Sequence, residues 1–221
     1  TELENEVDIQ TYFYENYDNI IPFISPYYSF ALETITNLIP PDTISIVDLG
    51  CGTGTLLAEI VKHYPSIQSV TGIDCNQSLA KKFHSKFPRN WKGRKRFCHH
   101  DLAKKTELPI ADIYISSLAL HNLEPKNQID LISSVLGIAP VFLLFDVYRC
   151  ETKDGESDKT NFITQFMNLN NISPAIQQSV LKEIDNNDHP LSINQLERLF
   201  KCMGCTYEVI ILMHGFVLFR I

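Results

Sequence analysis

Three glycines, at positions 50, 52 and 54, follow a short apolar segment and precede a segment with helical spacing. Glycine allows a tight turn and a close approach between backbone and ligand, and the following helix offers unpaired N–H groups at its first turn. The spacing is G-x-G-x-G with Asp48 just before it, whereas dinucleotide-binding turns have G-x-G-x-x-G. The Asp48 carboxylate can pair with an ammonium group of a ligand. The N–H groups of the helix can donate to a carboxylate of the same ligand. The alternative is a turn without a ligand.

Further polar residues follow the next apolar segments. Asp74 comes 20 residues after the third glycine, where an acid accepts hydrogen bonds from ribose hydroxyls in nucleotide-binding sheets, although it could also cap the next helix. Asp101 could accept from a ring amino group with Leu102 against the ring, or merely cap a turn. Ser116 and Ser117 end a fourth apolar segment and are expected on the floor of the same site.

Apolar segments alternate with segments of helical spacing between residues 44 and 147. Strands are predicted at 44–49, 69–73, 96–99, 111–116 and 141–147, and helices at 55–64, 77–87 and 126–136. Continuous apolar strands separated by helices indicate a parallel sheet covered on both faces. With strands at 206–212 and 216–221, the expected fold is α/β: a doubly wound, seven-stranded, mostly parallel, Rossmann-like sheet with a C-terminal antiparallel hairpin and helical cap segments.

The cap segments are predicted on both sides of the central strands. Residues 1–40 are expected to form a helical lid, with one helix over 3–17 that Pro22 interrupts and a second from Pro26 to about Leu38. Residues 41–221 form the main domain, with a helical insertion at about 150–190. Within it, 149–160 is predicted to be a mobile loop before helices at 162–170 and 174–185. Ser192 and Gln195 form a capping box for a helix over 192–203.

The ordered motifs resemble those of class I methyltransferases that use S-adenosylmethionine (SAM). These motifs are Asp-Leu-Gly-Cys-Gly-Thr-Gly at 48–54, Gly-Ile-Asp at 72–74, Asp-Leu at 101–102, and Ala-Asp-Ile at 111–113 through Leu-His-Asn-Leu at 120–123. The likeness covers 44–147 and extends to the hairpin, and it is greatest to small bacterial-type enzymes that modify metabolites. It implies SAM as cofactor, S-adenosylhomocysteine (SAH) as product, and cofactor contacts from Tyr17, Asp48, Gly50, Cys51, Gly52, Asp74, Cys75, Asp101, Leu102, Ser116 and Ser117.

Two positions depart from the pattern of the class. Residues 137–140, Gly-Ile-Ala-Pro, stand where a Pro-Gly-Gly turn is usual, and Cys75 stands where a small polar residue is more usual. Neither removes an expected cofactor contact.

Methyl transfer is an in-line displacement that needs a base only if the acceptor must lose a proton. His121, just beyond the fourth strand, is the candidate base, with packing of the next helix as the alternative. Asp146 and Tyr148 end the fifth strand and are expected to face the acceptor pocket, where Arg149 could bind an acidic group. The aromatic stretch from Tyr12 to Tyr28, which includes Tyr17, forms either part of a lid or ordinary packing.

Composition narrows the classes of substrate and the cellular location that we expect. The net charge of −7 argues against a nucleic-acid substrate, although residues 92–96 are basic and form either a solvated loop or an RNA contact. No apolar run reaches about 18 residues and no signal-peptide pattern opens the chain, so we expect a cytoplasmic protein with reduced cysteines. No metal site is expected, because Cys202 and Cys205 lie at a helix end.

The expected function is methyl transfer from SAM to a small-molecule acceptor. The alternatives are a tRNA or rRNA methyltransferase and a non-catalytic SAM-binding partner protein. The sequence leaves open whether the protein is a monomer or a homodimer.

Overall fold

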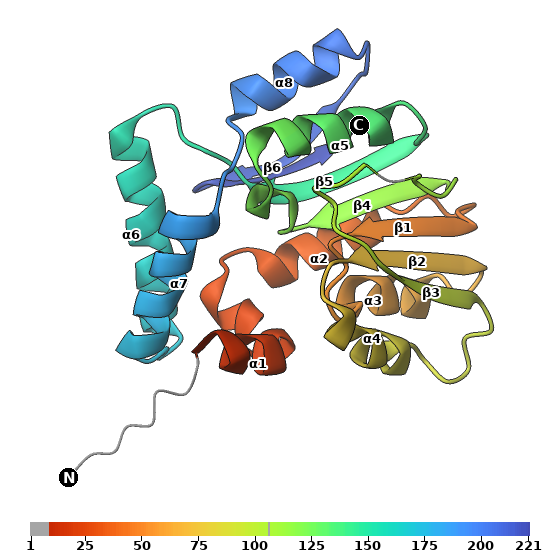
Figure 1. Ribbon diagram of the computed structural model, residues 1–221, viewed down its shortest axis with the longest axis horizontal. Helices are drawn as coiled ribbons and strands as arrows, with labels where there is room; N and C mark the ends of the chain where they lie inside the picture. Colours follow the sequence, from red (N-terminus) through yellow and green to blue (C-terminus); the bar gives the residue numbers. More distant parts are fainter. Residues whose placement is uncertain (1–8, 106) are drawn as a thin grey trace.

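The computed structural model describes residues 9–105 and 107–221, with side chains described from residue 16 onward (Figure 1). One seven-stranded sheet runs in the order β3-β2-β1-β4-β5-β7-β6. Strands β1 to β5 are parallel, and β7 is antiparallel to both β5 and β6. The doubly wound sheet with a closing hairpin is therefore confirmed. Its strands are β1 Ser45–Leu49, β2 Ser69–Asp74, β3 Arg94–His99, β4 Ile113–Ser117, β5 Val141–Val147, β6 Glu208–Met213 and β7 Phe216–Arg220.

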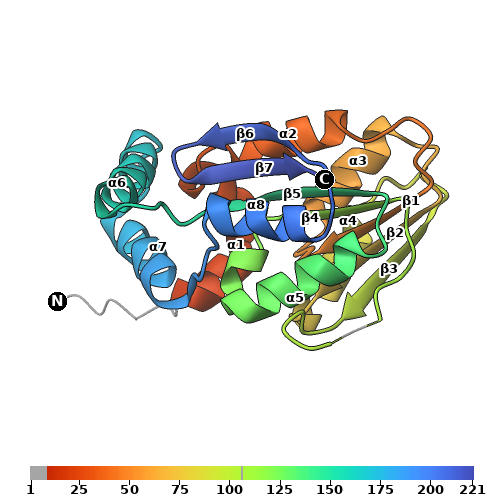
Figure 2. The ribbon, with the colours of Figure 1, turned by 90° about the horizontal axis from the view of Figure 1, so that it is seen from above.

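Helices cover both faces of this sheet (Figure 2). One face packs against α2, α3 and α4, and the other against α5 and α8. Short 3₁₀ turns precede α4 and α5. The elements are α2 Tyr28–Asn37, α3 Thr55–His63, η1 Gln77–Leu79, α4 Ala80–Lys86, η2 Leu120–Asn122, α5 Pro125–Leu136 and α8 Ile193–Cys202.

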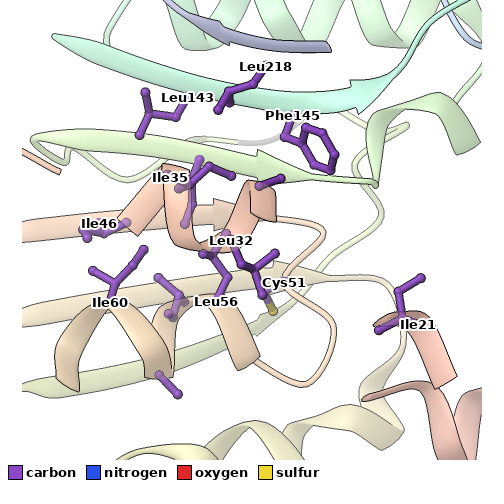
Figure 3. Close-up of a cluster of buried hydrophobic side chains, with 14 of the residues drawn as sticks. Ile21, Leu32, Ile35, Ile46, Cys51, Leu56, Ile60, Leu143, Phe145 and Leu218 are labelled. Atoms are coloured by element: carbon purple, nitrogen blue, oxygen red, sulfur yellow. The ribbon is translucent and has the colours of Figure 1, made fainter. Parts of the chain in front are cut away.

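Alternate residues of the central strands supply two hydrophobic cores. On β5, Leu143 and Phe145 point into the core shared with α2 and α3, where Ile46 of β1 joins them (Figure 3). Their neighbours Phe142 and Leu144 belong to the second core, under α5 and α8. Because both faces are covered, these strands are apolar at nearly every position, and this is why they were recognisable in the sequence.

Three further helices lie together beyond one end of the sheet, α1 Ile9–Ile24, α6 Lys153–Leu169 and α7 Pro174–Asn187 (Figures 1 and 2). Helix α1 contacts both α6 and α7. The first helix and the segment between β5 and α8 are thereby brought to the same side of the molecule. Among the described residues, no helix is both long and apolar enough to cross a membrane.

The structure corrects two details of the helical segments. Pro22 does not interrupt the first helix, which continues to Ile24, because a proline this close to the helix end removes a single interior hydrogen bond. The predicted loop at 149–160 is also wrong, since α6 begins at Lys153. The Thr152 hydroxyl caps it by accepting from the Gly155 N–H (3.1 Å), and Asp154 and Glu156 occupy its first turn. Residues 3–8 of the predicted first helix lie outside the described residues.

Candidate active site

A cavity of about 730 Å³ lies where strands β1 to β4 end and is closed on one side by α1 and α2. In a parallel sheet these strand ends are where nucleotide-like ligands bind. Ten of the eleven residues expected to contact the cofactor line this cavity: Tyr17, Asp48, Gly50, Cys51, Gly52, Asp74, Cys75, Asp101, Leu102 and Ser117. Residues from distant parts of the sequence are thus brought around one space.

The glycine turn is shaped by contacts that only glycine allows. Gly50 has φ 74°, and a Cβ placed on it would clash with the Cβ of Ala119, in the segment that follows β4. The N–H groups of Gly50 and Cys51 donate to the Ile73 carbonyl oxygen (2.8 and 3.1 Å), which fixes the turn against β2. At Gly52, with φ 52°, the space for a Cβ is open. The turn is therefore tightly held at its start and leaves room for a ligand further on.

Asp48 is a buried carboxylate on the cavity wall, with 3% of its surface exposed. No residue in the described part of the chain hydrogen-bonds to its side chain. Burial, and then the negative charge of Asp74, raise the pKa of Asp48 to about 8. A buried carboxylate without a partner is costly, so the group is largely neutral below this pKa, and its role in binding a cationic ligand stays a prediction.

Asp74 both supports the glycine turn and lines the cavity. Its Oδ2 accepts from the Gly52 N–H (2.9 Å), and its Oδ1 accepts from the Asn76 N–H (2.8 Å). Asp101 similarly accepts from the Ala103 N–H (3.0 Å) while lining the cavity. These backbone contacts agree with the turn-capping alternatives. Carboxylate oxygens accept more than one hydrogen bond, so the ligand-binding role of each stays a prediction.

The two serines after β4 are placed differently. The Ser116 hydroxyl donates to the Leu49 carbonyl oxygen (2.9 Å), is fully buried, and does not reach the cavity. Ser117 lines the cavity, and its buried hydroxyl has no hydrogen-bond partner within the described residues. Like Asp48, it is a polar group that a ligand would satisfy.

Asp18 of α1 is a cavity residue that sequence reasoning missed. Its Oδ1 accepts from the hydroxyls of Thr53 (2.6 Å) and Thr55 (2.9 Å), and its Oδ2 is paired with the Lys86 Nζ (2.6 Å). This group, which we call the Asp18 latch, fastens α1 to the glycine turn, α3 and α4. Its other members lie 35 to 68 residues from Asp18 in the sequence. No local sequence pattern therefore predicts the latch.

His121 lies beside the cavity but not on its wall. Its Nδ1 is 2.5 Å from the Asp146 Oδ1, and its Nε2 lies 3.7 Å from the Asp188 Oδ1 and 3.2 Å from the Nδ2 of Asn122, which does line the cavity. Burial disfavours the charged imidazole, but the charge and hydrogen bond of Asp146, and then the charge of Asp188, outweigh it and raise the pKa of His121.

Asp146 and Tyr148 are also placed away from the cavity wall. The Asp146 carboxylate accepts from the backbone N–H groups of Leu120 (2.9 Å) and Val147 (2.8 Å) as well as from His121. Tyr148 packs against the core under α5 and α8, and its N–H donates to the Gly215 carbonyl oxygen (2.8 Å). Direct contact of these two side chains with an acceptor stays a prediction.

The seven-stranded fold is shared with solved methyltransferases. Residues 46–138 match the family model described as "Methyltransferase domain". The matched region of the chain is therefore a methyltransferase domain.

Individual known proteins are similar to the chain at low sequence identity. The carboxy-S-adenosyl-L-methionine synthase of a Nitratiruptor species is 24% identical over 122 residues, 54% of this chain and 50% of that protein. The matched region of the chain thus covers about half the length of this curated relative.

Solved structures share the fold. An O-methyltransferase family protein from Burkholderia thailandensis is 13% identical, with a TM-score of 0.65 over 95% of this chain and 59% of that chain. The magnesium protoporphyrin IX methyltransferase of Synechocystis PCC 6803, solved with bound SAH, is 12% identical, with a TM-score of 0.65 over 98% of both chains.

Proposed function

We propose that the protein binds SAM in this cavity and catalyses transfer of its methyl group to a small-molecule acceptor. The observation that carries the proposal is the buried carboxylate of Asp48, which has no partner among the described residues and lies beside the glycine turn. The amino-acid end of SAM carries an ammonium that would pair with the ionised carboxylate and favour that form, whereas a pyrophosphate brings no cation to it.

The other wall residues fit the rest of SAM. Asp74 offers carboxylate oxygens for ribose hydroxyls, and Asp101 with Leu102 offers an acceptor and an apolar surface for adenine. The N–H groups at the first turn of α3 suit the ligand carboxylate, because those of Gly50, Cys51 and Gly52 already donate within the protein. Bound SAM supplies a methyl group already activated by its sulfonium. The protein then has to orient the acceptor and exclude water.

A small acceptor is favoured over RNA by the way the cavity is enclosed. Helix α1 is fastened across it by the Asp18 latch, and the chain has a net charge of −7. A phosphate backbone would meet an acidic protein. The magnesium protoporphyrin IX methyltransferase, whose chain matches this one along almost its whole length, is named for a small-molecule substrate.

Synthesis of carboxy-SAM, for which the curated relative is named, is a second candidate that one observation disfavours. Carboxy-SAM carries an additional carboxylate, and a buried carboxylate needs a cation or several donors. The described residues that line the cavity include no lysine or arginine. Transfer of an unmodified methyl group requires no cation on the cavity wall.

The enclosure of the cavity leads to a first prediction. We propose that residues 1–40 act as a lid on the domain formed by 41–221, and that the insertion at about 150–190 moves with it, since α1 contacts α6 and α7. Hydrogen exchange with and without SAH should show ligand-dependent protection in both 1–30 and 149–190. Protection confined to 48–55 and 74–102 would contradict a lid.

A pair of variants isolates the latch. Asp18→Ala removes the contacts to Thr53, Thr55 and Lys86, so ligand-dependent protection of α1 should be lost while that of residues 48–55 remains. Glu33→Ala is the matched control, because Glu33 is an exposed acid on α2. It should leave the protection pattern unchanged.

The proposed activity is tested by measuring SAH production from SAM across pools of metabolites, with RNA as a separate pool. We expect SAH release with a small-molecule pool. Release with RNA alone would move the function to nucleic-acid methylation. Binding of SAH without release in any pool would favour a non-catalytic SAM-binding protein.

A further inference from the structure

The segment that follows β4 forms a part of the cavity wall that is largely free of expected cofactor contacts. Residues 117–119, 122 and 123 line the cavity there. Leu118 has φ 51°, in the left-handed region that a leucine rarely adopts, and its N–H donates to the Phe145 carbonyl oxygen (2.9 Å). Strained residues of this kind are concentrated at ligand-binding sites. The segment is thus held in an unfavourable shape beside the cavity.

Asn122 is a polar side chain on this part of the wall. Its Nδ2 donates to the Ala119 carbonyl oxygen (3.2 Å) and lies 3.2 Å from the Nε2 of His121. These two contacts use both hydrogens of the amide. The Oδ1 of Asn122 accepts no hydrogen bond from the part of the chain that the structure describes. It is therefore the polar atom that Asn122 offers to a ligand in the cavity.

The imidazole of His121 determines whether this arrangement can form. Its Nδ1 faces the Asp146 carboxylate at 2.5 Å, and an ionised carboxylate only accepts, so Nδ1 carries a hydrogen in both charge states. In the neutral ring Nε2 is an acceptor, and the Asn122 Nδ2 can donate to it. In the protonated ring Nε2 also carries a hydrogen, and two donors would face each other. A half-turn of the amide then places Oδ1 against Nε2 and turns Nδ2 toward the cavity.

Charged groups from three parts of the fold surround the imidazole. Asp146 ends β5, Asp188 follows α7 with its Oδ1 3.7 Å from the His121 Nε2, and Lys159 of α6 contributes a positive charge. Burial lowers the pKa of His121, Asp146 and Asp188 raise it, Lys159 lowers it, and the net effect is a rise. The imidazole therefore changes charge at a pH above 6.5.

We propose that Asn122 hydrogen-bonds the methyl acceptor, and that the protonation state of His121 selects which group of the Asn122 amide the acceptor meets. The inference rests on the proposed function and names a property of its substrate. With His121 neutral, Oδ1 is presented, so the preferred acceptor carries an O–H or N–H group at the methylated atom or next to it. With His121 protonated, the same position offers N–H groups instead. In this role Asn122 touches the acceptor and His121 is a positioning residue.

The link between the two side chains is tested without an acceptor. In the ligand-free protein, NMR follows the Asn122 side-chain amide from about pH 5 to about pH 8.5. Nuclear Overhauser effects between its amide hydrogens and the carbon-bound hydrogens of His121 should be present above the titration midpoint of His121 and lost below it. The amide of Asn90, exposed in the loop before β3, should not change. An imidazole that does not titrate, or an amide that keeps one orientation, would overturn the switch.

The contact with the acceptor is tested by steady-state kinetics on the compound isolated from the metabolite pool that releases SAH. Asn122→Ala should raise the KM of this acceptor about three- to tenfold, the usual effect of losing one hydrogen bond. SAH affinity should be unchanged, and kcat should change less than about twofold. The wild-type KM should rise as pH falls through the His121 midpoint, and the variant should lose this dependence. Asn90→Ala should behave as wild type.

The outcomes separate this inference from the proposed function. A wild-type KM in Asn122→Ala, or a loss of kcat at unchanged KM, would overturn the contact while methyl transfer stands. An acceptor without an O–H or N–H group would overturn it as well. If no pool releases SAH, the proposed function and the acceptor contact fail together, and the NMR experiment still decides whether His121 controls Asn122.

Discussion

Replacing Asp48 with asparagine is expected to make the ligand-free protein more stable and the binding of SAM at least about tenfold weaker. In the folded protein burial raises the pKa of Asp48 to about 8 from its ordinary value of 3.8, so folding disfavours its ionised form. That cost is absent at low pH and grows as pH rises from about 4 to about 8. Since one pKa unit corresponds to about 1.4 kcal/mol, Asp48→Asn should gain roughly 2–4 kcal/mol near pH 7 to 8.

Thermal unfolding at pH 5 and pH 8, with and without SAH, checks this expectation. The gain should be larger at pH 8. Asp112→Asn is a matched control of opposite sign. Although partial burial opposes it, hydrogen bonds from the N–H groups of Ile44 and Ser45 (2.8 Å each) lower the pKa of Asp112. This variant should be less stable than wild type, with unchanged SAH affinity. An Asp48→Asn protein with wild-type stability and affinity would show that the carboxylate has no ligand role.

The second large effect is expected at His121. If its imidazole takes a proton from the acceptor, His121→Asn should lower kcat about 10²–10⁴-fold and leave SAM affinity nearly unchanged. The base must be neutral to act. Since Asp146 and Asp188 raise the pKa of His121, the wild-type rate should rise with pH through a value above 6.5, and this limb should be lost in the variant.

The His121 experiment must separate loss of a catalytic base from loss of structure. The Nε2 atom that would take the proton lies 3.2 Å from the Asn122 Nδ2, and Asn122 stands between it and the cavity. His121 also joins β5 to the Asp188 segment, so the variant's unfolding temperature is measured alongside kcat. His63→Asn, at an exposed site on α3, is the control. Wild-type kcat in a folded His121→Asn protein would remove the imidazole from the mechanism.

The features that sequence predicted well are those set by local pattern. Continuous apolar strands such as 141–147 were found because both faces of the sheet are covered. The glycine turn was found because its backbone geometry excludes other residues. Asp74 is the last residue of β2, whose carboxyl end meets the cavity as expected for a parallel sheet. For these positions the neighbouring residues in the sequence are enough to predict where the side chain lies.

The features that sequence missed depend on contacts between distant segments. No sequence pattern near Asp18 predicts its contacts with Thr53, Thr55 and Lys86. The Asp146 oxygens accept from His121 and nearby backbone N–H groups, contacts that no local pattern indicates, while contact of Asp146 with an acceptor stays a prediction. The surroundings of the β5 end depend on how the helices of the proposed lid and of the insertion pack. These helices lack the continuous apolar runs that made the central strands recognisable.

Isothermal calorimetry of the full chain with SAH and with NAD tests the central claim most directly. Asp48 beside a G-x-G-x-G turn suits a ligand with an ammonium group and opposes one with a pyrophosphate. The account predicts one site for SAH with at least about tenfold tighter binding than NAD, a difference of about 1.4 kcal/mol. NAD binding that equals or exceeds SAH binding would contradict it.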